Sequence, residues 1–246
     1  TGVDLVELMI RVAAGEPLPF KQEDIKPNGW AIECRINAED PFRGFLPSVG
    51  RLVKYRPPET VEGQVRVDTG VFEGGEISMY YDSMIAKLIC HGGTRDQAIA
   101  RLRDALNAFV IRGIDSNIPF QAALMQNPRF LSGVFTTAFL AEEYPDGFVA
   151  ADVVHDDPGL LAALAAFGRR RYIDRAVQVS GQMAGHQRKV GDEWVVQMEG
   201  KDYPVVVKPI PGGYSVTHGA DRYDLVSDWK FGELVFHGTC NGAPIC

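Results

Sequence analysis

The feature that most constrains the fold is a change of hydrophobic pattern in the second half of the chain. Residues 160–167 are all apolar, and a helix without a polar stripe has to be enclosed by other elements. Beyond residue 176 the pattern alternates in short runs typical of β-strands. A sheet that curls around the helix would cover it and also hide the edges of the sheet. The expected strands are residues 177–179, 193–198, 202–208, 214–217, 223–226 and 234–236.

This central helix is expected to run from Pro158 to about Arg171. Three consecutive arginines, 169–171, follow its apolar part. Surrounding acidic residues and the absence of interleaved aromatic residues argue against a nucleic-acid site here. We interpret the arginines as charges that compensate the dipole at the C-terminal end of the helix.

The first half of the chain mixes helices with strands. Hydrophobic spacing predicts amphipathic helices whose apolar faces pack into a core, the second of them capped by Thr94. A Pro-, Gly- and Asp-rich stretch at 145–158 predicts a linker. We therefore expect a domain at 1–148, a linker at 149–157 and a second domain at 158–246. The helices are predicted at 3–13, 94–109 and 118–125, and the strands at 30–36, 51–55, 65–69 and 85–90.

Composition excludes several classes of protein. The 246 residues carry a formal charge of −7, which argues against unspecific binding to nucleic acid or to an anionic membrane. No apolar run is long enough to cross a bilayer and no signal peptide leads the sequence, while both ends look cut, as in a fragment. The four cysteines lack zinc-type spacing and indicate a reducing compartment. The five histidines are scattered, so no metal site is expected.

Arg66 is the candidate for a chemical role. An arginine offers a permanent charge and a planar fork of donors, which suits the stabilisation of an oxyanion. Tyr81 and Asp82 follow in the next polar cluster and are the candidate substrate-binding residues. The alternative interpretation is an ordinary pair between Arg66 and Asp68, which stand two residues apart on one face of a strand.

A series of motifs flanks Arg66 on both sides. They read Cys34-Arg35-Ile36-Asn37-Ala38-Glu39-Asp40-Pro41, Phe45-Leu46-Pro47-Ser48-Val49-Gly50, Tyr80-Tyr81-Asp82-Ser83-Met84, Gly92-Gly93-Thr94-Arg95-Asp96 and Ile111-Arg112-Gly113-Ile114-Asp115-Ser116-Asn117. In this order they resemble the C-terminal subdomain of the ATP-grasp enzyme biotin carboxylase, over about residues 1–148. The resemblance implies that Arg66 contacts the ureido oxygen of biotin and stabilises the enolate, and that Tyr81 and Asp82 shape the wall beneath the biotin ring.

The second half carries a further resemblance. Residues 174–183 and 191–196 are similar to the start of the mediating (BT) domain of propionyl-CoA carboxylase α subunits. This implies an antiparallel β-barrel around one long helix, incomplete here, which docks on a carboxyltransferase β subunit. The candidate aromatic anchors for the partner are Trp194, Tyr203, Tyr214 and Trp229, which would alternatively be buried core residues.

Together the resemblances imply an α+β chain from the α subunit of a biotin-dependent acyl-CoA carboxylase, a ligase of the propionyl-CoA carboxylase type. Such an enzyme uses ATP, bicarbonate and Mg²⁺ or Mn²⁺, with biotin attached covalently to a carrier domain of the same polypeptide. The ATP-grasp motifs and the biotin-attachment site are missing from these residues, so alone they are predicted to be inactive. The resemblance further implies an α6β6 hetero-oligomer in the bacterial cytoplasm or the mitochondrial matrix.

Two alternatives stay open at this point. The residues could form a non-catalytic interaction module that joins subunits. They could also belong to another carboxylating ATP-grasp enzyme, such as one of purine synthesis, although the long β-rich second half disfavours this.

Overall fold

The structure is a computed structural model that describes residues 2–153, 155–178, 180–183, 185 and 189–246. The chain divides into two compact units, the first of which ends at Val153. This division lies within the stretch predicted as a linker, and the functional boundaries at 148 and 158 stay a prediction.

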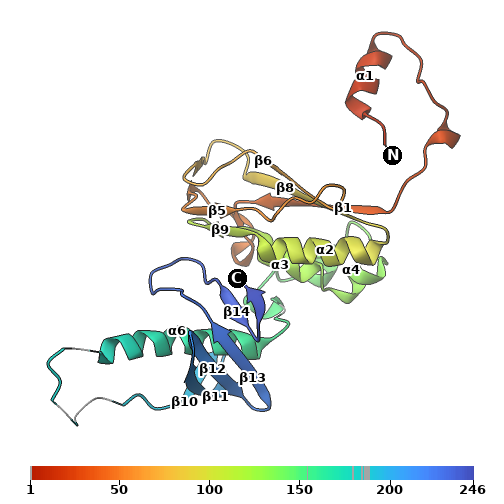
Figure 1. The fold of residues 1–246 in the computed structure, drawn as a ribbon. Coiled ribbons are helices and arrows are strands. Elements are labelled where there is room, and N and C mark those ends of the chain that lie inside the picture. Colours follow the sequence, from red (N-terminus) through yellow and green to blue (C-terminus); the bar gives the residue numbers. More distant parts are fainter. Residues whose placement is uncertain (1, 154, 179, 184, 186–188) are drawn as a thin grey trace. The chain divides into compact units, whose positions relative to one another are not determined.

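A three-stranded antiparallel sheet forms the centre of the first unit (Figure 1). It contains β1 (Trp30–Asn37), β8 (Met84–Gly92) and β6 (Val65–Thr69), in the order β1-β8-β6. Apolar side chains such as Cys34, Leu88 and Cys90 alternate into the core, whereas their neighbours along each strand lie on the open face. One face of the sheet is therefore buried and the other is polar.

Helix α2 (Arg95–Ala108) packs against the buried face of this sheet. Thr94 caps it as predicted, because its Oγ1 accepts a hydrogen bond from the Gln97 amide at 3.2 Å. The predicted apolar stripe is also confirmed, and its buried members are Ala98, Ile99, Leu102, Ala105 and Leu106.

Shorter elements complete the first unit. The predicted strand over 51–55 is divided, because β4 pairs with β7 while β5 pairs with β9. The strands are β2 (Glu39–Asp40), β3 (Leu46–Pro47), β4 (Gly50–Arg51), β5 (Lys54–Arg56), β7 (Glu76–Ile77) and β9 (Val110–Arg112). The helices are α1 (Leu5–Ala13), α3 (Ile118–Leu124), α4 (Pro128–Ser132) and α5 (Phe139–Glu143), with 3₁₀ turns at Gln22–Asp24, Pro41–Arg43 and Ala150–Asp152.

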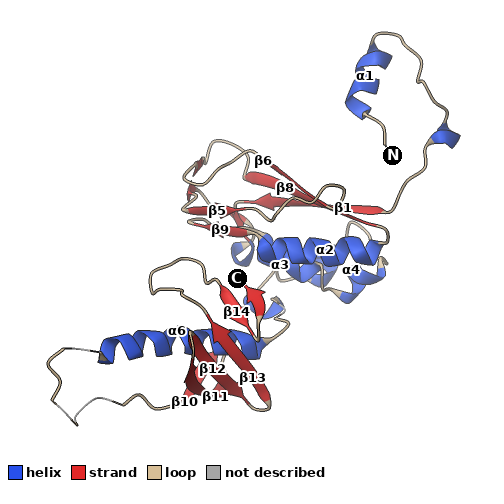
Figure 2. Ribbon diagram, in the orientation of Figure 1, coloured by secondary structure: helices blue, strands red, loops and turns tan. Residues whose placement is uncertain are grey.

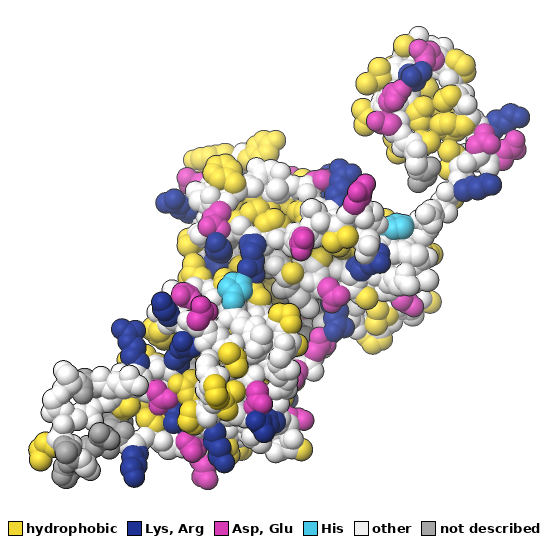
Figure 3. Space-filling model, in the orientation of Figure 1, with side chains coloured by type: hydrophobic (Ala, Val, Ile, Leu, Met, Phe, Trp, Pro, Cys, Tyr) yellow, Lys and Arg dark blue, Asp and Glu magenta, His cyan; other side chains and the backbone are white. Residues whose placement is uncertain are grey.

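Helix α1 differs from the prediction that it packs into a core. It has the expected amphipathic pattern and Asp4 caps its first turn, but none of its residues is buried within the described part of the chain. Its apolar side chains lie on the surface in Figure 3. The helical periodicity was therefore readable from the sequence, whereas the burial was not.

The second unit consists of one long helix and an antiparallel sheet whose strands follow each other in chain order (Figure 2). Helix α6 (Pro158–Val177) packs across β10 to β13. The strands are β10 (Glu193–Met198), β11 (Lys201–Ile210), β12 (Gly213–His218), β13 (Asp221–Val226), β14 (Gly238–Cys240) and β15 (Ala243–Ile245).

Some predicted boundaries in this unit are wrong. Helix α6 continues through the three arginines to Val177, so these arginines do not end it, and the predicted strand at 177–179 fails at Val177 while residue 179 lies outside the described residues. The predicted strand at 234–236 is a loop that turns Phe236 onto the core. The last two strands lie beyond it instead.

The predicted barrel is only partly realised. Each strand from β10 to β15 pairs with the next, but among the described residues β15 does not pair with β10, so the sheet is open. One stripe of α6 is buried against the sheet, while Ala165 and Arg169 on its other side are exposed. The helix is thus covered on one side rather than enclosed. None of the described helices is both long and apolar enough to span a membrane.

Candidate functional site

The open face of the β1-β8-β6 sheet carries a ladder of charged side chains. Arg35 on β1 and Asp68 on β6 both lie opposite Lys87 on the central strand β8. Glu33 and Arg66 both lie opposite Ile89. Residues directly opposite each other share one face of a sheet, so these three basic and two acidic side chains lie on the same surface.

Arg66 lies on this face and is paired. Its Nε donates to Asp68 Oδ1 at 2.8 Å, and 74% of the side chain is exposed. The hydrogen bond raises the pKa of Arg66 and lowers that of Asp68. This is the pair that the sequence left open as the alternative, and an exposed ion pair of this kind contributes little to stability.

Tyr81 and Asp82 lie in the loop that leads into β8. Asp82 Oδ1 accepts a hydrogen bond from the Met84 amide at 3.1 Å and so fixes the entry to the strand, and the Tyr81 side chain is exposed. Arg66 lies opposite Ile89, five residues beyond Met84, which is a rise of about 17 Å along a strand. The structure does not bring Arg66 together with Tyr81 and Asp82.

Arg35 is the arginine nearest to that loop along the sheet. It lies opposite Lys87, while Asn37 lies opposite Met84 at the start of β8. Its Nε is 3.8 Å from Glu33 Oε1, and 68% of the side chain is exposed. The sequence contained a signal for it, because Arg35 stands inside the first motif of the resemblance, but strand pairing was needed to show that it lies two positions nearer to this loop than Arg66 does.

A polar network joins the end of β1 to the start of β8. Glu39 Oε1 accepts hydrogen bonds from Ser83 Oγ at 2.6 Å and from Asn37 Nδ2 at 3.3 Å. The Ala38 amide donates to the Ser83 carbonyl at 2.7 Å. Asn37 Oδ1 is buried without a partner among the described residues. This network holds the loop of Tyr81 and Asp82 against the strand that carries Arg35.

Among the described residues, no group of three His, Cys, Asp or Glu side chains could hold a metal ion. Two cysteines of the first unit lie in its core. Burial raises the pKa of the Cys34 thiol to about 12 and that of Cys90 to about 11. Both thiols therefore stay protonated at neutral pH and act as apolar core groups.

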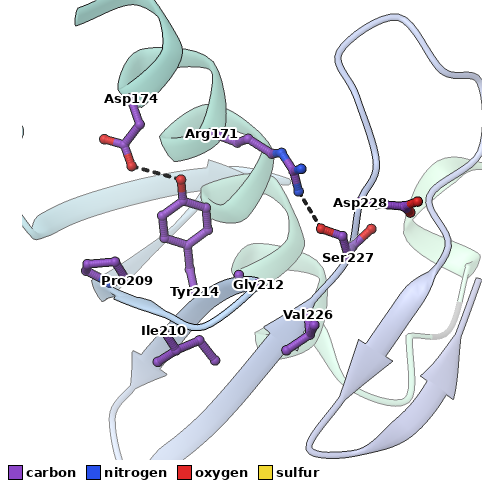
Figure 4. Close-up of a pocket in the computed structure, with 10 residues that line it drawn as sticks. Arg171, Asp174, Pro209, Ile210, Gly212, Tyr214, Val226, Ser227 and Asp228 are labelled. Atoms are coloured by element: carbon purple, nitrogen blue, oxygen red, sulfur yellow. Dashed lines mark hydrogen bonds between the residues drawn. The ribbon is translucent and has the colours of Figure 1, made fainter. Parts of the chain in front are cut away.

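The second unit has an open cavity of about 640 Å³ beside helix α6 (Figure 4). Tyr214 donates its hydroxyl to Asp174 Oδ2 at 2.8 Å, and Arg171 donates to the Ser227 carbonyl at 2.5 Å. Because these polar groups bind one another across the wall of the cavity, their arrangement joins the helix to the sheet.

The aromatic residues predicted as anchors mostly serve the core. Trp194, Tyr214 and Trp229 pack against it, and the Tyr203 ring lies 5.4 Å from that of His218. Phe231, which the sequence pattern did not single out, is 69% exposed. Its ring lies 5.3 Å from the ring of Tyr172 on α6.

Comparison with known proteins gives two family matches in tandem. Residues 33–142 match the family described as biotin carboxylase C-terminal domain, and residues 161–246 match the propionyl-coenzyme A carboxylase BT domain. The chain belongs to the biotin-dependent carboxylases. Both predicted resemblances are confirmed, one for each unit of the structure.

Individual relatives of this carboxylase chain agree. A propionyl-CoA carboxylase alpha chain of Ruegeria pomeroyi is 49% identical over the whole chain, which covers 39% of that relative. The mitochondrial alpha chain of Homo sapiens is 40% identical over 94% of the chain, which covers 32% of it. The biotin-dependent carboxylase chain described here thus spans well under half the length of these relatives.

Solved structures of biotin carboxylases match part of the chain. The biotin carboxylase subunit of a pyruvate carboxylase gives a TM-score of 0.55 at 47% identity, over 59% of this chain and 32% of that one. The biotin carboxylase domain of Hydrogenobacter thermophilus 2-oxoglutarate carboxylase, bound to MgADP, ADP and bicarbonate, gives a TM-score of 0.54 at 47% identity, over 59% and 31%. At these identities the likeness extends beyond the fold to the family of biotin-dependent carboxylases.

Proposed function

We propose that this chain is part of the α subunit of a biotin-dependent acyl-CoA carboxylase whose acyl substrate is propionyl-CoA. One observation carries the proposal: a biotin carboxylase C-terminal domain is followed directly by a propionyl-CoA carboxylase BT domain. Domains are proposed at 1–148 and 158–246, joined by a linker at 149–157. The order of these two domains disfavours a carboxylating enzyme of purine synthesis, because the chain of such an enzyme ends soon after the first domain.

The complete subunit would work as a ligase that carboxylates biotin with ATP, bicarbonate and Mg²⁺ or Mn²⁺. Support comes from a structural relative that was solved in complex with MgADP, ADP and bicarbonate. Biotin would supply the ring nitrogen that carries the carboxyl group, from a carrier domain of the same polypeptide. The described residues contribute a wall of the site and not the ATP-binding part, so alone they are proposed to be inactive.

The residues on the open face fit a ring that gains negative charge. Arg35 and Lys87 offer two cations on neighbouring strands, and Asp82 with Tyr81 forms the adjoining loop. We infer that Arg35 holds the developing oxyanion, because it lies nearer to that loop than Arg66 does and its nearest acid, Glu33, is 3.8 Å away. The role predicted for Arg66 stays a prediction, and its bond to Asp68 disfavours it.

Matched substitutions in the complete subunit separate the two arginines. Removal of an oxyanion donor typically lowers kcat by about 10²- to 10³-fold, so Arg35→Ala should lower biotin carboxylation, measured with free biotin, by this factor. Arg66→Ala and the exposed control Arg43→Ala should retain most of the activity. Loss in Arg66→Ala with activity retained in Arg35→Ala would restore the original prediction, and unchanged activity in both would exclude the oxyanion role for either residue.

The second unit is proposed to join subunits. As a BT-type domain it would dock on a carboxyltransferase β subunit, its sheet closing around α6 in the complete subunit, in an α6β6 assembly. The exposed ring pair of Phe231 and Tyr172 supports a docking role, because aromatic residues are enriched in interface centres. If the chain were a purely non-catalytic interaction module, it would have the same docking surface, but Arg35→Ala would not lower biotin carboxylation.

Docking can be tested by co-purification of the β subunit with the complete α subunit. Phe231→Ser should weaken the complex at least tenfold, since an aromatic residue at an interface centre contributes about 2 kcal/mol or more. Val195→Ser removes a comparably exposed apolar side chain from β10 and should leave the complex intact. Equal affinity of both variants would contradict this surface as the docking site.

The relatives support a proposal for the location of the protein. The matched alpha chains include one from a bacterium and several that are named mitochondrial. We propose the bacterial cytoplasm or the mitochondrial matrix, which are both reducing and so fit the buried thiols of Cys34 and Cys90.

A further inference from the structure

Asn117 binds the backbone of the strand that carries Arg35. Its Oδ1 accepts from the Asn37 amide at 2.9 Å and its Nδ2 donates to the Arg35 carbonyl at 3.0 Å. Its own amide donates to the Asn37 carbonyl at 3.1 Å. The residue is only 5% exposed, so these bonds are protected from water.

The position of these bonds gives them a specific effect. Strand β1 is an edge strand, with β8 on one side only, and the groups that Asn117 binds belong to its other edge. A buried strand edge without partners is costly because each unpaired backbone group loses its bonds to water. Asn117 takes the place of a neighbouring strand at residues 35 and 37, and so fixes the backbone from which the Arg35 side chain projects.

Asn117 is itself held on a rigid support. It directly precedes α3, whose Phe120 and Ala123 are buried. The Phe120 ring packs edge-to-face against Phe45 and Phe148, with centroids 4.9 and 5.3 Å apart. A residue that is locked in this way can position a neighbouring strand precisely.

We propose that Asn117 is the positioning residue for Arg35: through the Arg35 carbonyl and the Asn37 peptide groups it sets where the guanidinium stands relative to the loop of Tyr81 and Asp82. This inference rests on the role of Arg35 given under the proposed function. It identifies a residue 82 positions along the chain from Arg35 as part of the machinery of that site.

The test uses Asn117→Asp in the complete subunit, with free biotin as the probe. The aspartate keeps the oxygen that accepts from the Asn37 amide, but puts a second oxygen against the Arg35 carbonyl in place of the donor. Misplacement of a positioned group by about 1 Å can cost as much as 10²-fold. We expect kcat/KM for biotin to fall at least tenfold with KM for ATP unchanged.

A matched control distinguishes positioning from loss of stability. Asn127 caps α4 through its Oδ1, which accepts from the amides of Arg129 and Phe130. Asn127→Ala should lower the melting temperature, because a lost cap costs about 1 kcal/mol, and should leave kcat/KM for biotin unchanged. If Asn127→Ala lowered it as much as Asn117→Asp, the effect would be one of stability and the inference would be overturned.

A double-mutant cycle completes the test. In the Arg35→Ala background, Asn117→Asp should produce no further loss in kcat/KM for biotin, since a positioning residue acts only through the group that it positions. If the losses of the two variants multiply, or if Asn117→Asp is active while Arg35→Ala is impaired, the inference about Asn117 is overturned but the proposed role of Arg35 stands. An active Arg35→Ala overturns the proposed role of Arg35 and the inference with it. Should Asn117→Asp not fold, Asn117→Ser takes its place with the same criteria.

Discussion

Arg170 and Asp174 lie one turn apart on α6, and Arg170 Nε donates to both carboxylate oxygens of Asp174, at 3.0 and 3.1 Å. The Nη1 of the same arginine donates to Asp192 Oδ1 and to the Val207 carbonyl, both at 3.0 Å. Only 8% of the Arg170 side chain is exposed. One buried cation therefore joins the helix to the loop before β10 and to β11.

Loss of this cation should destabilise the second unit. Arg170→Met keeps the apolar stem but leaves two carboxylates without their partner, which costs about 3 kcal/mol when such a pair is buried. Urea unfolding in a Trp30→Phe background measures this by tryptophan fluorescence, because Trp194 and Trp229 then report on the second unit. The exposed neighbour is the control: Arg169→Met should cost about 0.5 kcal/mol, because Arg169 is exposed and stacks over Tyr172. Equal midpoints for the two variants would contradict the assigned role.

The three adjacent arginines differ in burial and in their partners, which the sequence could not reveal. Composition and spacing correctly predicted a helix at this place, but they gave arginines 169–171 one common role at its end. Arg170 is buried because β10 and β11 bring Asp192 and the Val207 carbonyl to it from 22 and 37 residues away. Such long-range partners are invisible to local periodicity.

The stability of the second unit should also fall at alkaline pH. Burial, together with the hydrogen bond to Asp174, raises the pKa of Tyr214 to about 12, and burial with the bond to Asp157 raises that of Tyr223 to about 12. An unfolded tyrosine titrates near 10. Between these values the unfolded chain releases protons that the folded chain retains, so the contribution is complete below about pH 10 and is lost as the pH approaches 12.

The measurement is the urea midpoint of the second unit from pH 9 to 12. The protein that keeps both tyrosines should lose stability over this range. Tyr214→Phe should reduce the slope of the urea midpoint against pH, and a further Tyr223→Phe should reduce this slope again. Identical slopes in the three proteins would exclude these hydroxyls as the cause.

The candidate site shows a similar division between what was and was not predictable. The motifs identified the family, and the strands that carry Arg66 and Lys87 were predicted from their short β-type runs of residues. The register was not predictable: only the pairing of Arg66 with Ile89 and of Arg35 with Lys87 shows which arginine lies towards Asp82. Asn117 belonged to a recognised motif, yet its bonds to β1 required the folded structure.

Gly113, in the same motif as Asn117, should tolerate no side chain. Its φ is +102°, and a Cβ would lie 2.2 Å from the Arg51 carbonyl oxygen and 2.9 Å from the Val53 amide. Gly63 is the matched control, because its φ is +68° but a Cβ there would have no neighbour within 4 Å. Gly63→Ala should cost about 1 kcal/mol for the left-handed backbone alone. Gly113→Ala adds a clash with backbone, for a total of about 3 kcal/mol.

Hydrogen exchange of the α2 amides measures this cost, since the helix packs on the core sheet of the first unit. Gly113→Ala should speed exchange there far more than Gly63→Ala does. In the complete subunit it should also lower kcat/KM for biotin, because Gly113 directly follows β9 and leads to Asp115, whose amide donates to Ser48 Oγ at 2.9 Å, and then to Asn117. Equal exchange rates in the two variants would mean that the strand ends can separate without cost, and the close approach of residue 113 to Arg51 would not hold this loop in place.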